Sequence, residues 1–78
     1  TNLYRDVKRL LPVMALLVKS KNETIRLYAT RSLGKLNLEP KKIVPILIKR
    51  LSDKSEEVRE AAAFSLASFG SKKNDSKD

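Results

Sequence analysis

Residues able to carry out acid–base or metal chemistry are scarce in this sequence. Its 78 residues include no histidine and no cysteine, which excludes imidazole bases, thiol nucleophiles, disulfides and the usual zinc ligands. The acids that lie closest together, Glu56, Glu57 and Glu60, open a predicted helix, where negative charge is favourable without any catalytic role. Two glycines offer no phosphate-binding loop. We therefore predict no enzymatic activity, no cofactor and no metal site.

Basic residues are the more prominent chemical feature. The chain has 17 Lys and Arg against 9 Asp and Glu, a formal charge of +8. Most of the excess lies in residues 1–38, with eight basic residues and two acids, whereas residues 39–78 have nine and seven. Such a charge favours an acidic protein surface, nucleic acid or anionic lipid as a partner, and it could equally serve solubility alone.

The elements that must position these residues come from an internal duplication. Residues 6–37 align with residues 39–70 at an offset of 33, with eight identical positions. In the first copy the identical residues are Lys8, Pro12, Lys21, Glu23, Arg26, Ala29, Ser32 and Leu33. We therefore predict two equivalent units, residues 1–37 and 38–70.

Each unit has apolar residues at three- and four-residue spacing, which predicts a pair of amphipathic helices. The expected helices span about residues 2–19 and 23–36 in the first unit, and about residues 40–51 and 56–69 in the second. The buried face of the second helix is predicted to comprise Ile25, Ala29, Ser32, Leu33 and Leu36. This arrangement makes the protein all-α.

Helix boundaries are indicated by residues with strong local preferences. Asn22 and Ser55 can cap the second helix of each pair, and Pro12 predicts a kink or a break in the first helix. Asn37 and Gly70 are expected to end their helices. Residues 71–78 have no apolar side chain and are predicted to form a disordered polar tail.

Two surfaces are candidates for binding. Equivalent positions of stacked units should place a basic ridge along the first helices, formed by Arg5, Lys8, Arg9, Lys41 and Lys42. Such a ridge could follow phosphates, although no aromatic residues interleave it and no recognised nucleic-acid motif is present.

The second surface is the concave side of the stack, which second helices line in repeat proteins. Its predicted residues are Leu27, Thr30, Arg31, Lys35, Glu60 and Phe64. Phe64 occupies the position of Arg31 and is not needed by its own helix pair. It is either an anchor in a protein interface, as aromatic residues often are, or a residue that packs beneath the tail or against a further unit.

The pattern of each unit resembles the HEAT repeat. Proline stands early in the first helix, a short turn bears Asp or Asn, and the second helix begins with a β-branched residue and Arg and continues Ala-x-x-x-Leu. The residues that carry the resemblance are Pro12, Asn22, Ile25, Arg26, Ala29 and Leu33, and then Pro45, Asp53, Val58, Arg59, Ala62, Leu66 and Gly70. The resemblance implies an α-solenoid of two stacked helical hairpins.

In the HEAT family the turn Asp and the helix Arg form a hydrogen-bonded ladder between successive units. The resemblance therefore implies that Asp53 bonds to Arg26, Arg59 or both. The first unit has Ser20 where the second has Asp53, and a serine supplies no carboxylate, so the ladder should be incomplete on the amino-terminal side.

We expect a non-enzymatic, intracellular protein-interaction or scaffold module. Its predicted partners are a protein, with an acidic surface favoured, or further HEAT repeats; the alternative is a basic module that binds nucleic acid or another polyanion. Because solenoids generally need about three repeats for stability, a piece of a longer array, a self-associating module and a subunit of a larger assembly all remain open. The longest apolar run, Leu10 to Val18, contains Pro12 and is too short to span a bilayer.

Overall fold

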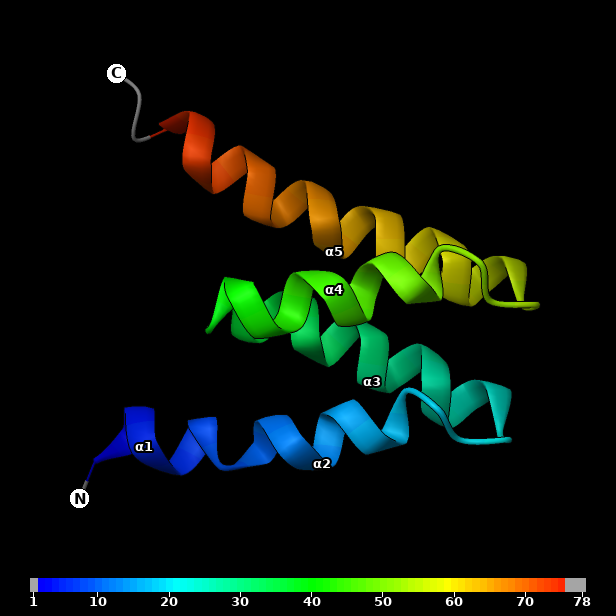
Figure 1. Cartoon of the computed structure of the whole chain (residues 1–78), viewed down its shortest axis with the longest axis horizontal. Coiled ribbons are helices and arrows are strands. Elements are labelled where there is room, and N and C mark those ends of the chain that lie inside the picture. Colours follow the sequence, from blue (N-terminus) through cyan, green and yellow to red (C-terminus); the bar gives the residue numbers. More distant parts are fainter. Residues whose placement is uncertain (1, 76–78) are drawn as a thin grey trace.

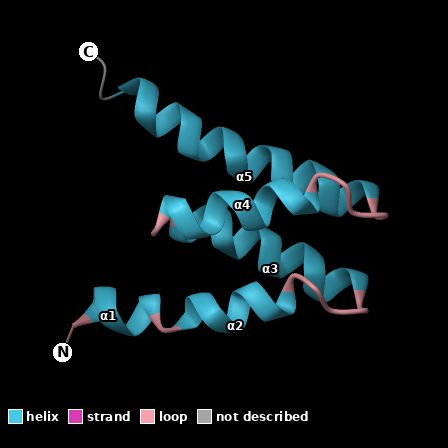
Figure 2. Ribbon diagram, viewed as in Figure 1, coloured by secondary structure: helices cyan, strands magenta, loops and turns pink. Residues whose placement is uncertain are grey.

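The chain folds as helices stacked in two layers (Figures 1 and 2). The structure, a computed structural model, describes the backbone of residues 2–75 and the side chains of residues 2–69. Over that range the elements are α1 (Leu3–Lys8), α2 (Leu10–Leu17), α3 (Glu23–Leu36), α4 (Pro40–Arg50) and α5 (Glu56–Asp75). The predicted all-α class is confirmed for this part of the chain.

The helices form the two predicted stacked hairpins. In the first, α3 runs back against α2, with α1 leading into α2, and in the second α5 runs back against α4. The hairpins join mainly through α3 and α5, which pack side by side and run in the same direction. This repetition follows from the duplicated sequence, because equivalent residues repeat the same local structure.

Helix capping follows the predicted residues. Asn22 Oδ1 accepts a hydrogen bond from the Ile25 N–H at 3.0 Å, and Ser55 Oγ accepts one from the Val58 N–H at 3.3 Å. Ser55 Oγ also donates to Glu23 Oε2 at 2.7 Å, so this cap links the two hairpins. Asn37 has left-handed φ and ψ of 51° and 39° and ends α3, as predicted.

The helix predicted over about residues 2–19 is divided into α1 and α2 near Pro12, which had indicated a kink or a break. Pro12 has no N–H to offer the carbonyl of Lys8, and its ring crowds that carbonyl. The helix is therefore interrupted at Arg9, between α1 and α2, although Arg9 itself keeps right-handed helical φ and ψ of −65° and −18°. The equivalent Pro45 lies only five residues after the start of α4, and α4 continues across it.

The carboxyl-terminal helix is longer than predicted. Gly70 was expected to end it and residues 71–78 to form a disordered tail, but α5 continues through Gly70 to Asp75. A glycine inside a helix costs only about 1 kcal/mol relative to alanine, which weakens a helix without stopping it. Residues 76–78 of the predicted tail lie outside the described residues.

An apolar core lies between the helices of the part of the chain that the structure describes. Its buried members are Leu11, Val18, Ala29, Leu33, Ile43 and Leu47, with Val58 and Ala62 also buried on α5. Ala29 and Leu33 lie on the buried face predicted for α3, whereas Ile25 is exposed. Within the described residues, none of the helices is both long and apolar enough to cross a membrane.

Candidate functional site

A buried ion pair fixes the position of α3 relative to the second hairpin. Arg26 donates from Nε to Asp53 Oδ2 at 2.9 Å and from Nη2 to Asp53 Oδ1 at 3.1 Å. The two side chains are only 6% and 3% exposed. A bidentate pair of this kind is among the stronger polar interactions in proteins, and it restricts both distance and orientation.

The Asp53 carboxylate accepts two further hydrogen bonds besides those from Arg26. The Ser55 N–H donates to Oδ1 at 2.9 Å, and Arg50 Nη1 donates to Oδ2 at 3.1 Å. Burial by itself raises the pKa of Asp53, but the hydrogen bonds from Arg26 and Ser55 and the charges of Arg26 and Arg50 outweigh it and hold the pKa below its ordinary value. The carboxylate is therefore ionised at neutral pH.

The ladder is only partly as the resemblance implied. Arg26 Nη1 also donates to the carbonyls of Ser20 and Lys21, at 2.9 and 3.2 Å, so it joins the turns of both hairpins. Arg59, its equivalent in the second repeat, donates from Nη1 to the Asp53 backbone carbonyl at 2.7 Å. Of the two arginines predicted to bond Asp53, Arg26 therefore contacts the carboxylate and Arg59 the main chain.

The two second helices approach closely at Gly34 and Ser65. A Cβ atom on Gly34 would lie 2.2 Å from Ser65 Oγ and 3.0 Å from Ser65 Cα, so only glycine fits there. Ser65 Oγ donates to the Thr30 carbonyl at 3.3 Å. Thr30 was predicted on the binding surface, but it is fully buried, and its hydroxyl donates to the Arg26 carbonyl at 2.7 Å. The face of α3 that includes Thr30 therefore packs against α5 and is not exposed to solvent.

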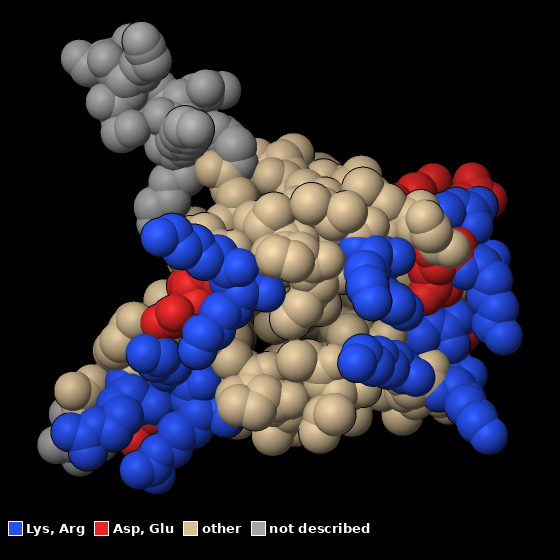
Figure 3. All heavy atoms as spheres, viewed as in Figure 1, with Lys and Arg blue, Asp and Glu red and all other residues tan. Residues whose placement is uncertain are grey.

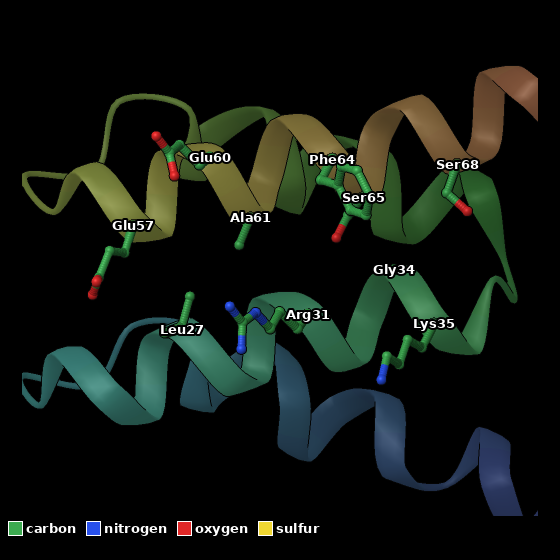
Figure 4. Close-up of a pocket in the computed structure, with 10 residues that line it drawn as sticks. All are labelled: Leu27, Arg31, Gly34, Lys35, Glu57, Glu60, Ala61, Phe64, Ser65 and Ser68. Atoms are coloured by element: carbon green, nitrogen blue, oxygen red, sulfur yellow. The ribbon is translucent and has the colours of Figure 1, made fainter.

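An open groove of about 620 Å³ lies between α3 and α5 on the side away from the first helices (Figure 4). Five of the six residues predicted for the concave surface line it, namely Leu27, Arg31, Lys35, Glu60 and Phe64. The remaining lining residues are Gly34, Glu57, Ala61, Ser65 and Ser68. Phe64 is 82% exposed, the largest exposure of any large apolar side chain described.

Charges in the groove are separated between its walls. Arg31 and Lys35 project from α3, and Glu57 and Glu60 project from α5. The Arg31 guanidinium lies 5.8 Å from the centre of the Tyr28 ring, which contributes a cation–π contact. The groove is thus polar at its edges and apolar along Leu27, Ala61 and Phe64.

The predicted basic ridge is interrupted by an acid. Lys8 Nζ pairs with Glu39 Oε2 at 3.0 Å, and the Tyr4 hydroxyl donates to the same oxygen at 3.2 Å. The hydrogen bond between them raises the pKa of Lys8 and lowers that of Glu39. In Figure 3 acidic atoms lie among the basic ones at the end where α1 and the start of α4 meet. The other four ridge residues, Arg5, Arg9, Lys41 and Lys42, are exposed.

Sequence reasoning missed several residues of these sites. Arg50 donates to both Asp53 and the Val18 carbonyl, at 3.1 and 3.0 Å, yet its equivalent in the first repeat is Leu17, so the duplication gave no signal for it. Gly34 did carry a signal, because a glycine in the middle of a strong helix pattern usually has a packing reason. Glu57 was recognised only as a favourable first-turn acid.

Among the described residues, no three acidic side chains come close enough together to hold a metal ion. Comparison with known proteins adds one positive finding: a family model for HEAT repeats matches residues 10–77. No curated protein and no solved structure is significantly similar to the chain. Repeats of this type generally mediate protein interactions and typically have no catalytic role.

Proposed function

The chain belongs to the HEAT-repeat family, and we propose that it is a non-enzymatic, intracellular protein-interaction module that binds its partner in the groove between α3 and α5. The observation that carries this proposal is Phe64. Its ring is 82% exposed on the wall of a groove, with Arg31 and Glu60 beside it. Exposed aromatic residues surrounded by charged ones are typical of the centre of protein interfaces.

We also propose that the first hairpin receives a further helical hairpin in a larger assembly. Tyr28 is 58% exposed, whereas its equivalent Ala61 is 8% exposed because it packs on the hairpin before it. Ile25 is likewise exposed, whereas its equivalent Val58 is buried. The open face of α3 therefore has the apolar residues with which its equivalent, α5, contacts a neighbour.

The groove is tested with two matched variants of exposed apolar residues. Phe64→Ser alters the groove, and Leu16→Ser alters an exposed leucine on α2, outside it. A partner captured from cell extract by the immobilised chain should bind the Leu16→Ser variant normally and lose binding to Phe64→Ser. Partners that bind both variants equally would refute the groove as the binding site.

The open face of α3 is tested by the melting temperature of a fused chain and by the molar mass of the unfused chain across a concentration series. Fusing a copy of residues 38–69 ahead of the first hairpin should raise the melting temperature, and Tyr28→Asp should remove that gain. Concentration-dependent association of the unfused chain that Tyr28→Asp abolishes would identify a second copy as the occupant instead.

Binding of nucleic acid or another polyanion is the second candidate function, favoured by the exposure of Arg5, Arg9, Lys41 and Lys42 on the first helices of the two hairpins. A salt-sensitive mobility shift with generic DNA that is abolished by Lys41→Glu with Lys42→Glu would support it. The ion pair of Lys8 with Glu39 makes this candidate the weaker one, because it neutralises the middle of the ridge.

A further inference from the structure

We propose that the groove between α3 and α5 selects an extended peptide segment with a basic residue at one end, an apolar residue in the middle and an acidic residue at the other end. This inference rests on the proposed function and specifies the chemistry of the partner at the same site. It follows from the order of charged and apolar side chains along the groove.

The groove has opposite charges at its two ends. Glu57 and Glu60 lie in the first turns of α5, and Lys35 lies in the last turn of α3. Because α3 and α5 run in the same direction, the acids lie near the start of both helices and Lys35 near the end of α3 (Figure 4). A bound segment therefore meets Glu57 and Glu60 first, Arg31 in the middle section and Lys35 last.

The distance between these ends suits an extended chain of four or five residues. Ser68 lines the groove near Lys35, and it lies eight residues after Glu60 and eleven after Glu57. At about 1.5 Å per helical residue the charged ends are about 12–17 Å apart. An extended strand advances about 3.3 Å per residue, so charges four positions apart match this span.

The middle of the groove offers an apolar contact. Leu27 and Ala61 lie between the acids and Phe64, and the Arg31 side chain reaches from α3 into the same section of the groove. Ser68 offers a hydroxyl beyond Phe64, which can exchange hydrogen bonds with the main chain of an extended ligand. A central leucine or similar side chain would therefore cover the exposed ring.

The balance of charge argues against a uniformly charged ligand here. The lining has two basic residues, Arg31 and Lys35, and two acids, Glu57 and Glu60, so its net charge is zero. A purely acidic segment would be repelled at Glu57 and Glu60, and a purely basic one at Arg31 and Lys35. The acidic partner surface that the overall charge of +8 favours suits the basic ridge better than this groove.

The test is fluorescence polarisation of the full chain with labelled seven-residue peptides, acetylated and amidated at their ends. The dipolar probe has arginine at position 2, leucine at position 4 and glutamate at position 6, with alanine elsewhere. Three controls replace the arginine, the glutamate or both with glutamine. We expect the dipolar probe to bind at least ten times more tightly than any control, and Phe64→Ala to weaken its binding about tenfold.

A charge-reversal variant gives the sharper result. Glu57→Lys with Glu60→Lys should transfer the preference to a probe with glutamate at both position 2 and position 6. The control Glu56→Lys changes an acid on the same turn but outside the groove, and it should leave the preference unchanged. Circular dichroism and thermal melts establish that each variant is folded, and glutamine replacements of Glu57 and Glu60 provide a milder loss of the same preference.

Equal binding of all probes to the folded wild-type chain would overturn the proposal. So would an unchanged preference in the charge-reversal variant, or binding that depends on Lys41 and Lys42 and not on Phe64. A natural partner that needs Phe64 but has no such segment would refute this inference and leave the proposed function standing.

Discussion

Asp53→Asn should weaken the fold strongly. It keeps the shape of the side chain but removes the charge opposite Arg26, whose side chain is only 6% exposed. It also turns one acceptor oxygen into an N–H donor beside the donors of Arg26, Arg50 and Ser55. The variant therefore leaves a buried guanidinium without its counter-ion.

The size of the loss can be estimated from that geometry. Removing one partner of a buried ion pair costs about 3–5 kcal/mol. A chain of 78 residues is stable by only about 4–12 kcal/mol, at about 0.05–0.15 kcal/mol per residue. The substitution should thus remove a large part of the free energy of unfolding at neutral pH.

The assay is urea unfolding followed by far-ultraviolet circular dichroism between pH 7 and pH 2.5. The pKa of Asp53 is lowered in the folded state, so its contribution is complete above the unfolded value of about 3.9 and is lost as pH falls through the folded pKa. The difference between wild type and variant should be largest at pH 7 and shrink below about pH 4.

The matched control is Asp6→Asn, which changes an exposed carboxylate in the first turn of α1 and should shift stability by less than about 0.5 kcal/mol. An Asp53→Asn variant with the wild-type urea midpoint at pH 7 would refute the reasoning. A difference that stays constant down to pH 2.5 would show that charge is not its cause.

Three further substitutions test other contacts, each by its urea midpoint or melting temperature. Arg59→Ala removes one hydrogen bond from an exposed side chain and should cost about 1 kcal/mol or less, and a loss equal to that of Asp53→Asn would contradict the assignment of the ladder to Arg26. Gly34→Ala should destabilise by about 1–3 kcal/mol despite its better helix propensity, because its Cβ overlaps Ser65, and adding Ser65→Gly should restore part of the loss. Asn37→Gly should stabilise by up to about 1 kcal/mol because it relieves a left-handed backbone, and a lower melting temperature would count against that explanation.

Local features of the fold were predictable because they depend on residues near one another in the chain. The caps at Asn22 and Ser55 and the left-handed Asn37 each involve at most a turn or two of helix. Even the break at Arg9 follows from Pro12 three residues later. Such features need no knowledge of what the helices pack against.

Features that depend on helix rotation and on distant contacts were not predictable in the same way. Thr30 and Gly34 lie on the side of α3 that looks solvent-facing within one hairpin, but the second hairpin covers that side. Arg50 reaches a carbonyl 32 residues away. The preference of Gly70 to end a helix was outweighed by the continuing α5. For Thr30, Gly34 and Arg50 the decisive partner lies elsewhere in the chain.

The Arg26 and Asp53 pair also determines how the protein must fold. Arg26 belongs to the first copy of the duplicated segment and Asp53 to the second, so neither copy holds a complete pair. Either half, released by proteolysis or synthesised alone, would lose this pair and leave its apolar face uncovered, although Asp53 would keep Arg50 in its own half. The two repeats should therefore unfold in a single cooperative transition, although their sequences are those of two independent copies.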